Sequence, residues 1–186
     1  MEQDRKKEVI NVCLDHFIQK GLSETSTRSL SSALKLQNAG LYYYFKTKDE
    51  AVLLCAEEAA LRLENALIVP AIKEITNPDL MFRRLKAMAD KMAPTMKFLV
   101  SVCSDNKYKD GMKPILDRLT ERYDHYAEMI AKKFKCGKLD IEPYVYITIT
   151  AVSNYMVFCE DEFIVPQMKL VKNAIIHFAN ISADAG

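Results

Sequence analysis

The sequence predicts an all-α protein, as judged from its composition and from the spacing of its apolar residues. Glycine and proline are scarce, with five and six copies among 186 residues. The plentiful residues, among them alanine, leucine, lysine and glutamate, favour helices. Apolar residues recur at intervals of three and four in one segment after another, as on one face of a helix. We expect about nine helices, arranged as a three-helix head with a helix-turn-helix and a larger helical body.

The head begins with an amphipathic helix over about residues 3–20, which Gly21 ends. The hydroxyl of Ser26 or Thr27 is suited to cap a second, short helix. A third short helix, Asn38 to Tyr44, follows after a tight turn. The second and third helices are too short to be stable alone. We therefore expect them to pack against the first helix as a helix-turn-helix.

The rest of the chain predicts a series of longer helices. Thr47 is placed to cap a helix over about residues 48–68, which Pro70 bends or ends. Pro94 is expected to divide the next helical segment into two helices. The expected bounds of these and the later helices are about 78–93, 94–103, 113–135, 143–158 and 166–181.

The last two helices predict a dimer interface. The helix over 143–158 is apolar nearly all round, so it needs cover on more than one side. The final helix has an apolar stripe with helical spacing at Ile164, Met168, Val171, Ile175 and Phe178. We expect both helices to pair with their copies across a two-fold axis as a four-helix bundle, the stripe meeting its own copy.

Charge and cysteine content indicate the setting. Residues 1–48 hold eight Lys/Arg and five Asp/Glu, a net charge of +3, which suits a polyanionic partner. The five cysteines form no Cys-x-x-Cys pair, no apolar run reaches the roughly 18 residues of a membrane span, and the charged N-terminal segment does not resemble a signal peptide. We therefore expect a cytoplasmic protein with reduced thiols and no membrane association.

An unusual aromatic run, Leu41-Tyr42-Tyr43-Tyr44-Phe45, lies on the third helix. At about 100° per residue, Leu41 and Phe45 share one face and are expected to pack inward. The three tyrosines then point in other directions and cannot all be buried. Their rings and hydroxyls suit contacts with sugars, thymine methyls and phosphates in a DNA major groove. The alternative is that two of them simply cover the core of a small domain.

The segment from Thr27 to Val52 resembles the DNA-binding domain of TetR-type transcriptional regulators. Its matching elements are Thr27, Leu30, Leu34, Leu36, the run Leu41–Phe45, Lys48, Asp49-Glu50 and Val52. The resemblance departs from the family in the turn, where Leu34-Lys35 stands in place of Ala-Gly and puts lysine at a position that favours a left-handed backbone. It implies a DNA-binding domain over residues 1–48 and an effector-binding and dimerisation domain over 49–186.

The resemblance also implies which residues contact DNA. Tyr42, Lys48 and the helix N-terminus at Thr27 are expected at phosphates. The residues expected at bases or sugars are Arg28, Gln37, Asn38, Ala39, Gly40 and Tyr43; Tyr44 and Lys46 complete the set. Glutamine and asparagine suit adenine edges, and arginine suits guanine.

Soft and aromatic side chains concentrate in the larger domain, which predicts an adaptable apolar site for a small effector. The alternative is an ordinary hydrophobic core. TetR-like proteins bind inducers in this domain, which favours the site, and Asp90, His125 and Asn154 are candidates for its polar contacts. The residues proposed to bind the effector are Met88, Met92, Met96, Tyr123, Tyr126, Tyr155 and Cys159.

These observations predict a dimeric repressor that binds double-stranded DNA at a palindromic operator and is released by a small apolar or aromatic effector. Two alternatives stay open: a cysteine-based redox sensor on the same scaffold, and a helical-bundle enzyme or metal protein that does not bind DNA. Because Glu-x-x-His, His-Glu-x-x-His, Gly-x-Ser-x-Gly and phosphate-loop motifs are all missing from the sequence, we expect neither an enzyme nor a bound cofactor or metal.

Overall fold

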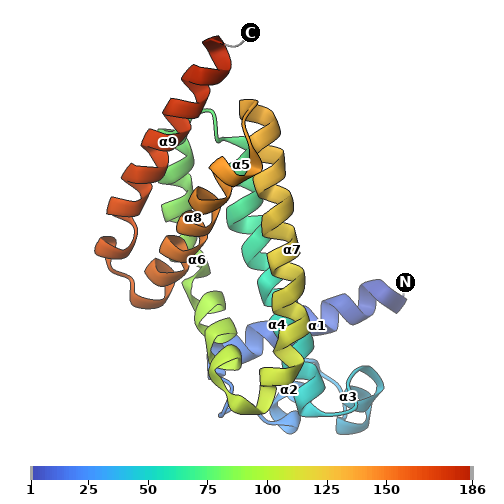
Figure 1. Cartoon of the computed structure of the whole chain (residues 1–186). Coiled ribbons are helices and arrows are strands. Elements are labelled where there is room, and N and C mark those ends of the chain that lie inside the picture. The colour runs from blue at the N-terminus through green and yellow to red at the C-terminus, as the bar shows by residue number, and fades with distance from the viewer. Residues whose placement is uncertain (1, 185–186) are drawn as a thin grey trace. The chain divides into compact units, whose positions relative to one another are not determined.

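The computed structural model describes residues 2–184, with side chains for residues 3–37 and 40–183, and all its regular structure over this range is helical. The predicted all-α fold class is therefore confirmed. In chain order the α-helices are α1 (Glu2–Lys20), α2 (Thr27–Ala33), α3 (Asn38–Tyr44), α4 (Lys48–Leu63), α5 (Val69–Lys73), α6 (Pro78–Ser104), α7 (Lys109–Phe134), α8 (Lys138–Phe158) and α9 (Val165–Asp184) (Figure 1). None of the described helices is long and apolar enough to cross a membrane.

The observed bounds differ from the sequence prediction in two helix starts and at two breaks. Helix α7 begins at Lys109 rather than near 113, and α8 begins at Lys138 rather than near 143, so Pro114 and Pro143 lie inside these helices.

The predicted break at Pro94 is wrong, since α6 continues through it. Proline removes the N–H that would bond to the carbonyl of Asp90, but Asp90 is exposed and Pro94 is as well, so water can satisfy that carbonyl. The segment predicted as one helix over 48–68 instead changes at Leu63 into a π-helical turn, Glu64–Ile68, and α5 then begins with Pro70 in its first turn.

The chain packs as two compact units. Unit 1 comprises Met1–Arg62 and Pro94–Leu116, and unit 2 comprises Leu63–Ala93 and Asp117–Gly186. Helices α6 and α7 therefore contribute one part to each unit. This division reflects the packing of the chain only. The boundary at residue 48 between a DNA-binding domain and an effector-binding domain stays a prediction.

Unit 1 has a small core to which each of its first four helices contributes. Phe17 of α1 stacks on Phe98 of α6, with ring centroids 5.7 Å apart. The almost fully buried side chains of this core are Val9, Cys13, Leu14, Phe17, Leu30, Leu41, Phe45, Val52 and Cys55. The short helices α2 and α3 are thus held by contacts with longer ones, as their length requires.

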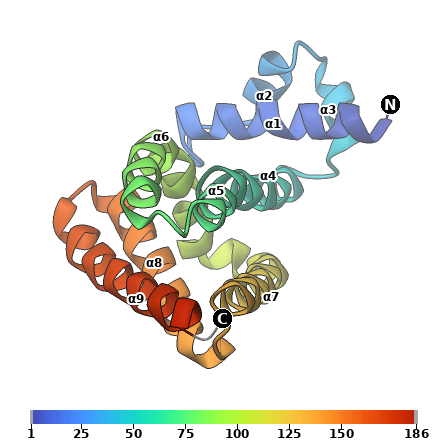
Figure 2. The same ribbon diagram turned by 90° about the horizontal axis from the view of Figure 1, so that it is seen from above.

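Unit 2 has its own core, built from α6, α7, α8 and α9 with the segment after α5. Helices α8 and α9 lie side by side and run in opposite directions (Figures 1 and 2). The buried members of this core are Ile75, Met81, Ala127, Ile130, Ala131, Phe134, Ile141, Val171 and Ile175.

The predicted role of the α9 stripe is wrong. Val171 and Ile175 are 4% and 7% exposed and belong to the core of their own unit, and Ile164 and Met168 are buried as well. The spacing of apolar residues along a helix is the same whether the residues pack in the core of their own chain or against a second copy. Any partner of α9 must therefore meet a different side of the helix.

Helices α2 and α7 both end in a Schellman motif with lysine in the left-handed position. Lys35 has φ 55° and Lys135 has φ 53°. In α2 the N–H of Leu36 bonds to the carbonyl of Ser31 at 2.9 Å, and in α7 the N–H of Cys136 bonds to that of Ala131 at 3.1 Å. The left-handed backbone predicted at Lys35 is therefore confirmed.

We predict that Lys35→Gly raises the free energy of unfolding by about 1 kcal/mol, because glycine adopts this backbone without the steric cost that a Cβ adds. Lys135→Gly should act in the same direction. Lys133→Gly, inside the last turn of α7, is the matched control and should destabilise by a similar amount. Urea unfolding followed by circular dichroism measures all three, and a Lys35→Gly protein no more stable than wild type would contradict the prediction.

Candidate nucleic-acid interface

A reciprocal cap fixes the start of α2. The Ser26 hydroxyl accepts a hydrogen bond from the Ser29 N–H at 3.1 Å, and the Ser29 hydroxyl accepts one from the Ser26 N–H at 3.0 Å. Of the two predicted capping residues, Ser26 is the one used. His16 of α1 is half-buried with Nε2 3.2 Å from the Ser29 hydroxyl oxygen. This contact ties the beginning of α2 to α1, and Thr27 opens the helix directly after it.

The turn between α3 and α4 is held by three hydrogen bonds. The Thr47 hydroxyl accepts from the Glu50 N–H at 3.1 Å, as predicted for a cap, and the Glu50 carboxylate accepts from the Lys46 N–H at 2.6 Å. The ammonium of Lys48 donates to the carbonyl of Leu22, 3.1 Å away in the loop between α1 and α2. Lys48 thus has a structural contact that the sequence did not predict, and a lysine retains two further N–H donors for an external anion.

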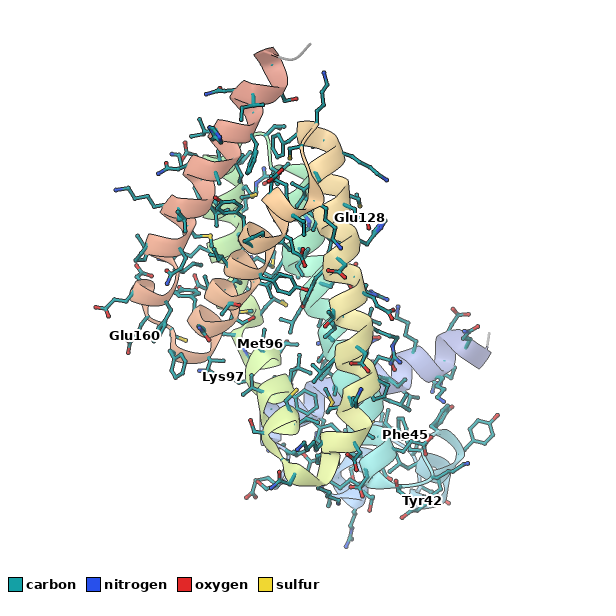
Figure 3. The ribbon with its side chains drawn as sticks, viewed as in Figure 1. Tyr42, Phe45, Met96, Lys97, Glu128 and Glu160 are labelled. Carbon is teal, nitrogen blue, oxygen red and sulfur yellow. The ribbon has the colours of Figure 1, made fainter. Side chains whose placement is uncertain are left out.

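Helix α3 separates its aromatic run into an inner and an outer face. Leu41 and Phe45 are each 2% exposed, which confirms that they pack inward. Tyr42 is 54% exposed and Tyr43 is 71% exposed. Figure 3 labels Tyr42 and Phe45 in this segment. The alternative in which two of the three tyrosines cover the core is wrong, because Tyr44 alone is half-buried.

Tyr44 supports the outer face from behind. Its side chain hydrogen-bonds Arg5 of α1, which also pairs with Glu8 at 2.8 Å, and these two contacts raise the pKa of the Arg5 guanidinium. The ring of Tyr43 packs edge-on against that of Tyr44, with centroids 5.1 Å apart and planes at 86°. The exposed ring of Tyr43 is therefore oriented by a tyrosine that is itself anchored to α1.

The remaining residues of the predicted DNA-binding set lie in α2, in α3 and in the segments beside them. Arg28, Gln37 and Lys46 are exposed. Gly40 is half-buried, and a Cβ at its position would lie 3.4 Å from the Cβ of Leu36, an ordinary contact. The side chains of Asn38 and Ala39 lie outside those that the structure describes.

A second anchor at the start of α4 was missed by the sequence analysis. The Asp49 carboxylate pairs with Lys107 at 2.6 Å and accepts a hydrogen bond from the Tyr108 hydroxyl at 3.2 Å. The hydrogen bond from Lys107 is the main reason that the pKa of Asp49 is lowered. The partners are about sixty residues apart in sequence, in the turn between α6 and α7, so no local pattern points to them.

The predicted effector residues are divided between the two units. Met96 lies in the part of α6 that belongs to unit 1, whereas the other six belong to unit 2. Among those six, Tyr155 is buried and donates a hydrogen bond to Asp90 at 2.5 Å, which with burial raises the pKa of Tyr155 to about 12. Cys159, at the end of α8, is exposed.

Unit 2 also contains a buried carboxylate that the sequence analysis did not select. Glu64, the first residue of the π-helical turn, is only 5% exposed. It pairs with Arg122 and accepts a hydrogen bond from the Tyr126 hydroxyl, both from α7. Burial and this hydrogen bond raise the pKa of Tyr126 to about 12. In a helical sequence rich in glutamate, only the fold distinguishes Glu64 from its exposed neighbours.

The thiols of unit 1 bear on the redox alternative. Cys13 and Cys55 are fully buried between α1 and α4, and burial raises the pKa of Cys13 to about 12 and that of Cys55 further. A thiol with so high a pKa is a poor nucleophile and reacts slowly with oxidants. Cys103 and Cys159 are exposed. In the described part of the chain no three His, Cys, Asp or Glu side chains gather as a metal site requires.

Comparison with known proteins identifies the first part of the chain. Residues 10–53, from α1 into α4, match the family described as "Bacterial regulatory proteins, tetR family". No curated protein matches the chain in sequence.

Solved structures share the fold over nearly the whole chain. A tetR-family transcriptional regulator from Streptomyces coelicolor has 15% identity and a TM-score of 0.60, over 99% of this chain and 84% of that chain. The multidrug binding protein EbrR, solved with imidazole, has 11% identity and a TM-score of 0.58 over 94% of each chain. The TetR family regulator PfmR from Thermus thermophilus has 16% identity and a TM-score of 0.52, over 92% of this chain and 97% of that chain. At these identities the likeness establishes the fold.

We predict that Cys13 and Cys55 do not react with Ellman's reagent in the folded protein at pH 8. With a pKa near 12 for Cys13, only about one thiol in ten thousand is a thiolate at that pH, and burial blocks access as well. All five cysteines should react in guanidinium chloride, which serves as the control. Rapid labelling of Cys13 or Cys55 in the native state, read by peptide mass spectrometry, would contradict this prediction and favour the redox alternative.

Proposed function

Because residues 10–53 match the tetR family of bacterial regulatory proteins, we propose that the chain is a ligand-responsive transcriptional repressor of that family. It binds a two-fold symmetric operator as a dimer and leaves the DNA when a small apolar or aromatic molecule binds unit 2. The single observation that carries the proposal is the outer face of α3, where Tyr42 and Tyr43 are mostly exposed on a helix whose other face is buried.

The outer face of α3 has the chemistry of a DNA-contacting surface. Two exposed aromatic rings are unfavourable in water and suit sugars and thymine methyls, while the hydroxyls suit phosphate oxygens. Arg28 and Lys46 flank this face with positive charge and are exposed. The anchors at Ser29, Tyr44 and Lys48 would hold this face in place before DNA arrives, which lowers the entropy cost of binding.

The proposed dimer is supported by an apolar seam on α9. Gln167, Leu170, Ala174, His177 and Ile181 follow one another at spacings of three and four along one side of the helix. Leu170 is 50% and Ile181 46% exposed. The Gln167 side-chain oxygen is buried, yet no donor among the described residues reaches it. A second α9 packed across this seam would cover the exposed apolar residues Leu170 and Ile181.

The effector part of the proposal is supported by the half-buried Met88, Met92, Tyr123 and Tyr126 in unit 2, since methionine and tyrosine suit an adaptable site. The structurally similar EbrR is a multidrug binding protein, which is consistent with a small-molecule site on this fold. An effector lowers DNA affinity to the extent that it binds the DNA-free arrangement of the dimer more tightly.

The DNA-binding surface is tested with random-sequence duplex DNA. We expect Tyr42→Phe to weaken binding several-fold, because it deletes a hydroxyl contact to phosphate. Tyr144→Phe, in α8 of unit 2 and outside the predicted DNA-binding set, is the matched control and should change binding little. Lys46→Ala should reduce the slope of log affinity against log salt by about one unit in each head that contacts DNA. Fluorescence anisotropy at several salt concentrations measures all three, and equal effects of Tyr42→Phe and Tyr144→Phe would contradict this assignment.

The dimer is tested with Leu170→Asp combined with Ile181→Asp. These side chains are exposed in one chain, so the variant should stay folded but sediment as a monomer, because an interface cannot bury four unpaired carboxylates. Val171→Asp is the contrasting control and should unfold unit 2, since Val171 is buried in its own chain. Sedimentation velocity with circular dichroism makes the measurement. A Leu170→Asp/Ile181→Asp protein that remained dimeric would exclude this seam.

A further inference from the structure

A buried charge lies where α4 gives way to the π-helical turn. The side chain of Glu64 is 5% exposed, whereas that of its charge partner Arg122 is 46% exposed. A buried carboxylate needs a compensating positive charge and hydrogen-bond donors, or it is strongly unfavourable. Here the carboxylate is fixed inside unit 2, while the guanidinium that compensates it reaches in from the surface. The cation of this pair is therefore the member that can be exchanged.

The π-helical turn explains why a carboxylate faces the interior at this point. Apolar residues dominate the inward face of α4 up to Leu63, and the wider turn over Glu64–Ile68 shifts the register of the residues that follow. Turns of this kind lower helix stability and occur frequently at functional sites. A helix that served packing alone would present an apolar residue where Glu64 stands.

Two tyrosines of α7 lie near the carboxylate, and a third, Tyr146 of α8, packs on one of them. Tyr126 donates its hydroxyl to Glu64. Tyr123, one turn earlier on α7, packs edge-to-face on Tyr146 of α8, with centroids 6.5 Å apart and planes at 88°. After burial, the charge of Glu64 is the next largest cause of the raised pKa of Tyr123, which places that ring within the field of the carboxylate. All three tyrosines are half-buried, so their rings are partly open to a ligand.

This combination selects for positive charge. A carboxylate with tyrosine rings beside it attracts an organic cation twice, through the charge and through the faces of the rings. An anion would have to displace Glu64, which is buried and belongs to the helix itself. A neutral ligand gains nothing from displacing Arg122 and would leave the carboxylate without its charge partner.

We propose that Glu64, Tyr123, Tyr126 and Tyr146 bind an organic cation, an aromatic or alkylated amine, which takes the place of Arg122 on the buried carboxylate. The inference rests on the proposed function, because it assigns a chemical class to the effector. In the wild-type protein Arg122 competes with the ligand. When the ligand binds, the guanidinium turns into solvent, where it is readily hydrated.

The test uses three small aromatic probes of related shape in isothermal titration calorimetry. Benzyltrimethylammonium carries a permanent positive charge, neopentylbenzene is its neutral isostere, and benzylphosphonate is an anion. We expect the cation to bind wild-type protein about tenfold or more tightly than either other probe. If the cation bound no better than its neutral isostere, or not at all, the proposal would be overturned.

Two variants separate a ligand site from a structural ion pair. Glu64→Gln keeps the side-chain shape and an acceptor for Tyr126 but removes the charge, so it should abolish the preference for the cation. Arg122→Gln removes the competing guanidinium and should raise cation affinity by about tenfold. Arg84→Gln, which breaks an exposed pair with Glu74 elsewhere in unit 2, is the matched control and should change nothing. Thermal unfolding of each variant checks that the fold is retained.

The decisive result is the sign of the Arg122→Gln effect. A purely structural ion pair predicts that losing either partner loosens the site and weakens every probe alike, which would overturn the proposal. DNA binding is measured separately by anisotropy. Release of DNA by the neutral probe without dependence on Glu64 would refute the assignment of the cation site as the effector site and leave the repressor proposal standing. Glu64-dependent binding of the cation that leaves DNA affinity unchanged would support the cation site and refute its role as the effector site of a repressor.

Discussion

The small core shared by α1, α2, α3 and α4 is the constraint on which the candidate interface depends. Helices of seven residues such as α2 and α3 do not persist alone. They persist here because Phe17, Leu30, Leu41 and Phe45 are buried together, and because polar contacts at Ser29 and Lys48 fix the intervening loops. Burying one face of α3 leaves Tyr42 and Tyr43 outside. The aromatic surface is therefore exposed because so short a helix buries only one of its faces in the core.

Unit 2 meets a different constraint, the cost of a buried carboxylate. Among its described residues Glu64 is the buried charged side chain, and a protein built for stability alone would have no reason to bury it. The π-helical turn, the guanidinium of Arg122 and the hydroxyl of Tyr126 together offset that cost. Retaining an unfavourable group with several compensating contacts is typical of a site maintained for binding.

The sequence predicted features that depend on local geometry and missed those that depend on distant partners. The inward faces of Leu41 and Phe45 follow from the helical period, and the left-handed Lys35 follows from the tight turn. The apolar stripe on α9 was predicted, but the spacing of its residues does not determine whether the same chain or a second copy packs against it. Glu64 was not found, because its partners lie 58 and 62 residues away and the π-helical turn has no sequence signal.

The central claim is that two copies of this head read one DNA site, and methylation protection tests it most directly. Duplexes that bind the protein are selected from a random pool, sequenced, and treated with dimethyl sulfate with and without protein. The account predicts a two-fold symmetric site with two protected groups of guanine N7 atoms in the major groove, centred about one DNA turn, ~34–36 Å, or a multiple apart. A single unsymmetric protected group, or no selected sequence at all, would contradict it.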